Sequence, residues 1–417
     1  MDRSTGRLRL IRRLAAVSTL VMSLALVPPV QAGVGISGGE DGSGAPAPAA
    51  PAAPRVSQTS VGFTDIGDSS LAFATAAIKY VAVTNQWMAD YGTDKFRPTI
   101  SESRALFARA VVEAFAPEEP IDPAITFSDL DETDPFFASA NVAVKLGWMH
   151  AKGGVFGPES PVTMAAVHYA LVSALPLEEE VAGLEAIHTE AGYSFAHPAK
   201  FPQILLGMAL HFRYNHPSEG ADVTPKDPLS RVEVAYSLWR AATTSKYDIA
   251  ALSKYSDIAL PAISTSKQKF VAFGLRYVGY PYIWGGDWYE KTPSGYCCGA
   301  QPQGGFDCSG LMWWDLKAAA DGYNNRSIRG YAGWSIPQRA SADMASIGKP
   351  LTYNKAQPGD LMFYDGDNNG TVDHVDVYLG NGWALDSSSG QGGVTILRVG
   401  EGWYNDHFVH ARSIMNG

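Results

Sequence analysis

The sequence predicts a multidomain protein in which repeated α-helical units precede an α+β domain with a central antiparallel sheet. Three prolines at similar spacing, Pro98, Pro158 and Pro225, each precede an apolar-periodic segment by a similar distance. Nearer the C-terminus, an apolar helical segment follows Cys308, and short strand-like segments are joined by Gly380-Asn381-Gly382. A glycine-rich turn between such segments is typical of a β-hairpin, which favours antiparallel pairing.

The first 32 residues have the organisation of a secretory signal peptide. Five arginines precede an apolar segment at residues 14–27, and Val30-Gln31-Ala32 is a small-residue cleavage site. The pair Arg12-Arg13 is a weak sign of the twin-arginine export route. No later segment has the length and apolar character of a membrane span. We therefore expect residues 1–32 to be removed and the protein to be secreted.

Acidic residues outnumber basic residues by 42 to 32, and the formal net charge is −10. Removal of the signal peptide takes away five arginines and one aspartate, which brings the net charge to about −14. A chain with this charge is repelled by nucleic acid and by anionic membranes, so neither is expected as a partner. The charge also keeps the protein soluble, whatever its function.

Residues 33–60 are dominated by Gly, Ala, Pro and Ser, a composition typical of an extended, disordered linker. Residues 61–244 contain a weak three-unit repeat. In each unit a proline is followed five residues later by a hydroxyl residue, which is Ser103, Thr163 or Ser230. A hydroxyl residue before an apolar-periodic segment is a helix N-cap signal. Each unit is therefore expected to contain a helix, a loop with Gly and Pro, and a second helix.

This repeat resembles the S-layer homology family. Phe96-Arg97-Pro98 and Phe156-Gly157-Pro158 match the end of the family's loop. Arg104 and Arg231 occupy the arginine position of its helix start, where the second unit has Met164. The resemblance implies non-covalent binding of an anionic secondary cell-wall polymer, with these two arginines as contacts. The repeats would then attach the protein to the cell wall without contributing to turnover. A helical spacer that binds no ligand is the alternative.

Residues 245–266 are interpreted as a linker to a last domain at residues 267–417. In that domain Cys308 lies between Asp307 and Ser309 at the predicted N-terminus of a helix. A helix N-terminus stabilises negative charge, so it favours the thiolate form that acts as a nucleophile. A buried structural cysteine is the alternative interpretation.

A cysteine nucleophile needs a base, and His374 is the best candidate because the strand-like segment 372–379 would hold its ring. The imidazole in turn needs a partner that fixes its orientation. A three-residue loop at 380–382 would place Asp386 opposite Asp376, within diagonal reach of His374. A two-residue turn would instead send Asp386 to the other face, and Asp376 is a rival partner. The fallback bases are His407 and His410.

The last domain resembles the NlpC-type cell-wall peptidases. The matching segments are Pro281-Tyr282-x-Trp284-Gly285-Gly286, Phe306-Asp307-Cys308-Ser309-Gly310-Leu311, Pro358-Gly359-Asp360-Leu361 and His374-Val375-x-Val377-Tyr378-Leu379-Gly380-Asn381-Gly382. The resemblance implies a papain-like α+β fold. It also implies hydrolysis of peptidoglycan stem peptides, commonly between D-glutamate and diaminopimelate.

By the same resemblance, Cys308 is the nucleophile, His374 the base and Asp386 the third member. The family often has a histidine at this third position, and an acid keeps its orienting role. The hydroxyl of Tyr282 would lie beside the thiolate. The residues expected to contact the substrate are Asp307, Ser309 and Trp284. An amidase on the same scaffold, cutting between muramic acid and L-alanine, and a non-catalytic wall-bound structural protein are the alternatives.

The chain has three cysteines, and Cys297 and Cys298 are adjacent. A disulfide between these two needs a strained ring, because their Cα atoms are closer than the usual range. A bond from either of them to Cys308 would block the nucleophile. The sequence leaves these pairings and free thiols open.

A calcium site is predicted at Asp365, Asp367, Asn369 and Asp373, which follow the spacing of the ligands in a calcium loop, with Gly370 at its sharp turn. The flanking segments are strand-like, so this is not an EF-hand. A polar hairpin loop without a metal is the alternative. No other cofactor is expected.

Overall fold

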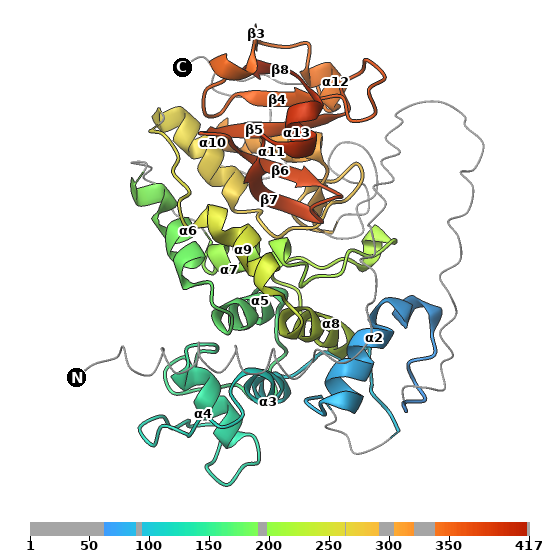
Figure 1. The fold of residues 1–417 in the computed structure, drawn as a ribbon, viewed down its shortest axis with the longest axis vertical. Coiled ribbons are helices and arrows are strands. Elements are labelled where there is room, and N and C mark those ends of the chain that lie inside the picture. Colours follow the sequence, from blue (N-terminus) through green and yellow to red (C-terminus); the bar gives the residue numbers. More distant parts are fainter. Residues whose placement is uncertain are drawn as a thin grey trace. The chain divides into compact units, whose positions relative to one another are not determined.

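The computed structural model describes residues 62–88, 94–190, 198–262, 264–291, 304–320 and 338–414 (Figure 1). The predicted signal peptide, the predicted linker at 33–60 and the pair Cys297-Cys298 lie outside the described residues. All of the described residues belong to one compact unit. Among the described residues, none of the helices has the length and apolar character needed to cross a membrane.

The region of the predicted repeat is helical. Its elements are η2 (Ser69–Ala74), α2 (Thr75–Ile78), η3 (Lys79–Thr84), α3 (Arg104–Phe115), α4 (Phe137–Lys145), α5 (Met164–Ser173), α6 (Glu178–Glu190), α7 (Phe201–Ala209), η4 (Glu219–Ala221) and α8 (Arg231–Ala242). Ser103 and Thr163 cap α3 and α5 through their side-chain oxygens, and Ser230 precedes α8 in a capping box with Glu233. The three hydroxyl residues that the sequence marks as N-caps therefore all begin helices.

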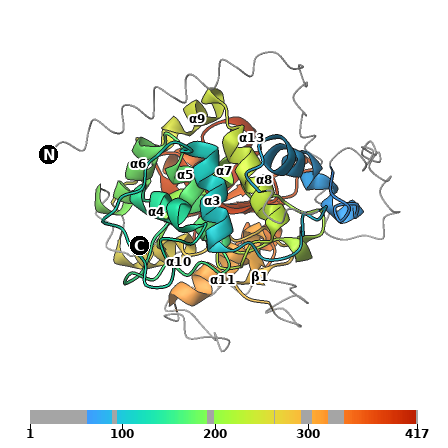
Figure 2. The ribbon, with the colours of Figure 1, turned by 90° about the horizontal axis from the view of Figure 1, so that it is seen from below.

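The starts of α3, α5 and α8 are hydrogen-bonded to one another in a closed cycle. Each helix start donates to the carbonyl of the proline that marks the next unit, and the third unit returns to the first. Each of these three hydrogen bonds is 3.0 Å long, and they join Ala105 to Pro158, Ala165 to Pro225, and Val232 to Pro98. Figure 2 shows α3, α5 and α8 close together, and α8 contacts both of the other helices. The prolines that reveal the repeat in the sequence are thus the acceptors that join its units.

Arg104 and Arg231 are part of these joints. The Nε of Arg104 donates to the carbonyl of Phe156 at 2.7 Å, and the Nε of Arg231 donates to that of Phe96 at 2.9 Å. The side chain of Arg231 is buried, with 0% of the residue exposed, and it pairs with Glu102 at 2.8 Å. The prediction that Arg231 contacts a wall polymer is therefore wrong, because its guanidinium lies in the interior. Arg104 is only partly buried, and its contact with a polymer stays a prediction.

Residues 245–262, in the segment 245–266 that was expected to form a linker, are folded instead. They contain α9 (Lys246–Leu252) and η5 (Ser253–Tyr255). The side chains of Leu252, Ile258 and Leu260 are buried, and the hydroxyl of Tyr255 donates to the carbonyl of Ile396 at 2.8 Å. The segment is ordered because its apolar side chains are buried against the rest of the protein. Its serine-rich composition does not predict this packing.

The last part of the chain is an α+β domain. Its elements are α10 (Thr265–Leu275), β1 (Asp287–Trp288), β2 (Gly305–Phe306), α11 (Cys308–Ala320), α12 (Ser341–Met344), β3 (Lys349–Leu351), η7 (Tyr353–Lys355), β4 (Leu361–Tyr364), β5 (His374–Gly380), β6 (Trp383–Ser388), β7 (Gly393–Arg398), α13 (Gly402–Asp406) and β8 (Phe408–Ser413). Among the described residues, six strands form one antiparallel sheet in the order β3-β8-β4-β5-β6-β7. The prediction of a central antiparallel sheet is confirmed.

Helix α11 is held against the middle of this sheet. It contacts β5, β6 and α10 (Figure 1). Leu311, Met312 and Trp314 are 0% exposed, and the indole of Trp314 donates to the hydroxyl of Tyr277 at 2.8 Å. Each large apolar side chain that is fully buried contributes about 1.5–3 kcal/mol. This packing fixes the position of the helix, and with it the residue at its N-terminus.

Candidate active site

Cys308 is the first residue of α11 and is only 7% exposed. The carboxylate of Asp307, just before the helix, accepts a hydrogen bond from the N–H of Gly310 and so caps the first turn. The Sγ of Cys308 lies 3.9 Å from the carbonyl oxygen of Asp373. The predicted helix N-terminus is thus observed, and it brings the thiol to the start of β5.

His374 is the first residue of β5 and lies between Cys308 and Asp386. Its Nε2 is 2.9 Å from the Oδ1 of Asp386, whose side chain is fully buried. Burial lowers the pKa of His374, but the charges of Asp386 and Cys308, together with a hydrogen bond to each, raise it well above its ordinary value. The ring is therefore favoured as an imidazolium, with a carboxylate on one side and the sulfur on the other.

The hairpin between β5 and β6 decides which face Asp386 occupies. Its turn contains two residues, Asn381-Gly382, and not the three residues 380–382 of the loop that would place Asp386 opposite Asp376. A register shift at residues 378–380 adds one residue to β5 and restores the pairing that a three-residue loop would give. Asp386 therefore falls on the same face as His374.

Two tyrosines bind the carboxylates around His374. The hydroxyl of Tyr404 donates to the Oδ2 of Asp386 at 2.7 Å, and that of Tyr364 donates to the Oδ2 of Asp376 at 2.8 Å. Burial, and then the charge of Asp386, raise the pKa of Asp376 well above its ordinary value. Asp376 is therefore disfavoured as a second anion and is bonded to Tyr364, which leaves Asp386 as the partner of His374. Neither tyrosine lies in a motif that the sequence marks.

Tyr282 lies on a short segment beside the start of α11. Its N–H donates to the carbonyl of Gly392 at 3.3 Å, and it forms a parallel bridge with Phe306, two residues before Cys308. Burial, and then the nearby charges of Cys308 and Asp307, raise the pKa of its phenol. The hydroxyl therefore keeps its proton at neutral pH, and its place beside the thiolate stays a prediction.

Arg339, which lies in none of the motifs of the sequence, holds two of the residues expected to contact substrate. Its Nη2 lies 2.9 Å from the Oδ2 of Asp307, and its Nη1 donates to the Oγ of Ser309 at 2.8 Å. Its Nε is 3.6 Å from the buried carboxylate of Asp287. Burial lowers the pKa of Arg339, but Asp307 and Asp287 outweigh this effect and raise it. Asp307 and Ser309 are thus tied into a network that orders the residues around Cys308.

Trp284, the third residue expected to contact substrate, is 58% exposed. Its backbone N–H donates to the carboxylate of Glu219 at 2.9 Å. Glu219 belongs to η4 in the region of the repeat, so a residue from outside the last domain lies at this edge of the site. Contact of Asp307, Ser309 and Trp284 with substrate stays a prediction.

The acidic loop between β4 and β5 brings three carboxylates together. One oxygen from each of Asp365, Asp367 and Asp373 lies within 4.8 Å of the others. The N–H of Gly370 donates to Asp365, and the amide of Asn369 donates to Asp367 at 2.8 Å. Such bonds also stabilise polar turns without a metal, so the calcium site at these residues stays a prediction.

The last domain is similar to known proteins. Residues 279–413 match the model of the NlpC/P60 family. The chain therefore has an NlpC/P60 domain at its C-terminus.

Named relatives share this domain. Murein DD-endopeptidase MepH of Escherichia coli (strain K12) is 31% identical over 143 residues, which are 34% of this chain and 43% of that protein. Peptidoglycan endopeptidase RipB of Mycobacterium tuberculosis (strain ATCC 25618 / H37Rv) is 36% identical over 122 residues, 29% of this chain and 43% of that protein. The solved structure of RipB has 27% identity and a TM-score of 0.28, and the match covers 36% of this chain and 66% of that chain. The chain spans less than half of the length of these two curated relatives.

The NlpC/P60 match contains Cys308, His374, Asp386 and Tyr282, and it also contains Arg339. It begins at Gly279, after the region of the repeat. The S-layer homology of residues 61–244 is therefore still a prediction, which depends on the motifs quoted above.

Proposed function

We propose that this protein is a secreted, wall-attached peptidoglycan hydrolase and that its NlpC/P60 domain is a cysteine endopeptidase. The observation that supports this most strongly is the buried sequence of contacts from Cys308 through His374 to Asp386 at the start of α11. Relatives named as peptidoglycan or murein endopeptidases match this same domain. This geometry supports the roles of nucleophile, base and orienting acid for the three residues.

In the proposed reaction, the Cys308 thiolate attacks the carbonyl carbon of a stem-peptide amide bond. The C–N bond breaks as the His374 imidazolium gives its proton to the leaving amine, and a thioester forms at Cys308. The neutral imidazole then takes a proton from a water molecule, whose oxygen attacks the thioester. The C–S bond breaks, a carboxylic acid leaves, and the thiolate–imidazolium pair is restored.

Asp386 supports both steps by holding the ring. Its Oδ1 fixes Nε2, so the other ring nitrogen faces the sulfur. The oxyanion that forms during attack is stabilised by the backbone N–H of Cys308 and by the protonated hydroxyl of Tyr282. Because the raised pKa of Tyr282 keeps its proton in place, this donor is available throughout the neutral range.

The proposed substrate is the peptidoglycan stem peptide, cut at the bond between D-glutamate and diaminopimelate. The resemblance of the motifs around Cys308 and His374 to NlpC-type peptidases supports this bond. The proposed wall attachment is through the region of the repeat, by binding an anionic secondary wall polymer. Of the two arginines first considered, only Arg104 remains as a candidate contact.

The experiment that tests the activity is digestion of muropeptides, released from purified cell walls by a muramidase, followed by mass spectrometry. The parent is expected to produce a fragment ending in D-glutamate and a fragment with a new free amine on diaminopimelate, and Cys308→Ala should produce neither. Release of stem peptides whose N-terminal residue is L-alanine would instead indicate the amidase. An inactive parent that still sediments with walls would indicate a structural protein.

Wall attachment has its own measurement. The full chain should sediment with purified walls, and it should stay in solution with walls from which the acidic polymer has been stripped. Arg104→Met should reduce sedimentation while leaving the melting temperature within a few degrees of the parent. Equal sedimentation of parent and variant would remove Arg104 as a contact.

A further inference from the structure

The segment between α7 and α8 contacts the NlpC/P60 domain through one buried arginine. Arg213 is 7% exposed, and its Nη1 donates to the carbonyls of Gly279 at 2.8 Å and Val223 at 3.0 Å. Its Nη2 donates to the carbonyl of Gly392. Given the peptidase activity proposed above, we infer that Arg213 is a positioning residue for catalysis, which acts from the region of the repeat by fixing the backbone that holds Tyr282.

Comparison of the three joints between the starts of α3, α5 and α8 shows how the position of Arg213 differs from those of Arg104 and Arg231. In two joints the first residue of α3 or α8 is an arginine, and its Nε donates to the carbonyl of the phenylalanine in Phe-x-Pro. The third joint differs, because α5 begins with Met164. The equivalent carbonyl there belongs to Val223, two residues before the proline, and it accepts from Arg213. The guanidinium of this joint therefore comes from another element, from which it also reaches the NlpC/P60 domain.

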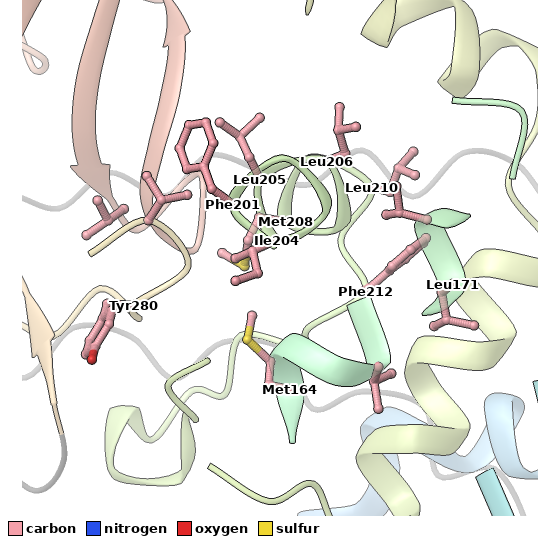
Figure 3. Packing of buried hydrophobic residues seen from close by; sticks show 14 of the residues in the cluster. Met164, Leu171, Phe201, Ile204, Leu205, Leu206, Met208, Leu210, Phe212 and Tyr280 are labelled. Carbon is pink, nitrogen blue, oxygen red and sulfur yellow. The ribbon is translucent and has the colours of Figure 1, made fainter. Parts of the chain in front are cut away.

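The two glycines whose carbonyls accept from Arg213 lie very close to residues that precede the NlpC/P60 domain. Gly279 and Gly392 have φ angles of +90° and +77°, which favour glycine. A Cβ atom at Gly279 would lie 2.4 Å from Ile204 in α7, and one at Gly392 would lie 2.5 Å from Asn215. Figure 3 shows Ile204 on α7 together with Tyr280, the residue that follows Gly279. The backbones of both glycines therefore lie directly against residues of the helices and loops before the NlpC/P60 domain.

The carbonyl of Gly392 is the link to the active site. It accepts from Arg213 and also from the N–H of Tyr282 at 3.3 Å. The carbonyl of Gly279 belongs to the same short segment, three residues before Tyr282. Arg213 thus holds both the beginning of this segment and the acceptor that anchors its end. A change at Arg213 displaces the hydroxyl of Tyr282 relative to Cys308.

Arg213 is suited to this role because it stays charged. Burial lowers its pKa to about 10, against the opposing charges of Asp222 and Glu233. At neutral pH the guanidinium is therefore protonated, and hydrogen bonds from a charged donor are roughly twice as strong as neutral ones. Its planar fork reaches three carbonyls, which the single ammonium group of a lysine cannot do in the same geometry.

The test is a double-mutant cycle in the full chain between Arg213→Met and Tyr282→Phe, with kcat and KM measured on muropeptides. Loss of one oxyanion donor costs about 10²–10³ in kcat, so Tyr282→Phe should fall in this range. Arg213→Met should lower kcat by at least about tenfold with little change in KM, since part of the same stabilisation is lost. In the Tyr282→Phe background, Arg213→Met should have less than about a twofold effect, because the residue it positions no longer acts.

Arg240→Met is the matched control. Arg240 belongs to the same region, is partly buried, and donates to the carbonyl of Leu210 at 3.2 Å. This variant should keep the kcat of the parent. Equal losses from Arg213→Met in both backgrounds, or no loss in the parent background, would overturn the inference. An inactive parent would instead overturn the proposed function, so the two failures are distinguishable.

Where Arg213→Met does not fold, as shown by its melting curve, Arg213→Lys replaces it in the same cycle. Lysine keeps the buried charge but cannot reach all three carbonyls, so kcat should still fall and the fall should still vanish with Tyr282→Phe. A lysine variant with the kcat and KM of the parent would also overturn the inference.

Discussion

Asp386→Asn should slow hydrolysis by between about a hundredfold and ten-thousandfold. Two unit charges at the observed separation of 2.9 Å attract each other by about 6 kcal/mol at an effective dielectric constant near 20. Since each 1.36 kcal/mol is tenfold in rate, complete loss of this attraction sets an upper limit of about four powers of ten. Asparagine keeps the size and one hydrogen bond of aspartate, so the measured loss should lie below that limit.

The substitution should also move the pH profile. Asp386 is the first of the groups that raise the pKa of His374 against the lowering effect of burial. Without its charge the pKa of His374 falls, so the imidazolium loses its proton at a lower pH. The basic limb of the kcat/KM profile should therefore shift to lower pH. The same reasoning applies to folding: the contribution of the charged ring is fully present below about pH 6.5 and is lost as pH rises through its raised pKa.

Two assays check this prediction. The first is kcat/KM on muropeptides between pH 5 and 9. The second is alkylation of Cys308 by iodoacetamide, resolved by mass spectrometry from any reaction at Cys297 and Cys298. Asp376→Asn is the matched control, since this neighbour is also fully buried but binds Tyr364. A parent-like profile for Asp386→Asn, or a larger loss for Asp376→Asn, would refute the assignment of the orienting acid.

Three further predictions follow from buried or clustered charges. Burial raises the pKa of Asp315 well above its ordinary value, so folding takes up a proton and stability falls as pH rises above about 4 towards that raised pKa. Asp315→Asn should flatten this slope, which is at most about 1.4 kcal/mol per pH unit, and parent-like urea midpoints at every pH would contradict it. Arg339→Gln leaves Asp307 and Asp287 without their buried partner and should cost about 3–5 kcal/mol of unfolding free energy, measured by urea titration; a loss below about 1 kcal/mol would count against this network. Calcium should raise the melting temperature of the parent but not of Asp367→Asn, and equal values with calcium and with chelator would remove the metal site.

The helix after Cys308 and the two strands that meet at Gly380-Asn381-Gly382 could be predicted because each has a local signal. The helix after Cys308 follows from its glycines and apolar residues, and the hairpin strands follow from alternation. The partnership of His374 and Asp386 could not be decided, because it depends on one extra residue at 378–380. Gly380 has a φ of +97° and Asn381 a φ of +52°, which the sequence Gly-Asn-Gly permits but does not require.

The roles of the arginines were the hardest to predict from the sequence. Arg231 matches a family motif, but a motif does not report exposure, and this side chain is fully buried. Arg339 and Arg213 have no local pattern at all. Arg213 bonds to carbonyls 66 and 179 residues away, so its role depends on tertiary structure that no periodicity encodes. Arg213 thus makes the same kind of hydrogen bond, from a guanidinium to a backbone carbonyl, as the arginines at the joints of the repeat. The repeat pattern does not predict its position.

These contacts change how the two parts of the chain relate in function. A region that served only attachment would need no buried contact with the NlpC/P60 domain. Here the hydroxyl of Tyr255 binds the carbonyl of Ile396 in β7, and Arg213 binds the carbonyls of Gly279 and Gly392. Removing residues 61–244 would take Arg213 away from the buried carbonyl of Gly279, and an unsatisfied buried carbonyl costs about 1–3 kcal/mol. The region of the repeat therefore helps to stabilise the NlpC/P60 domain. Without this region, the segment that contains Gly279 and Tyr282 would be the part that loses stability.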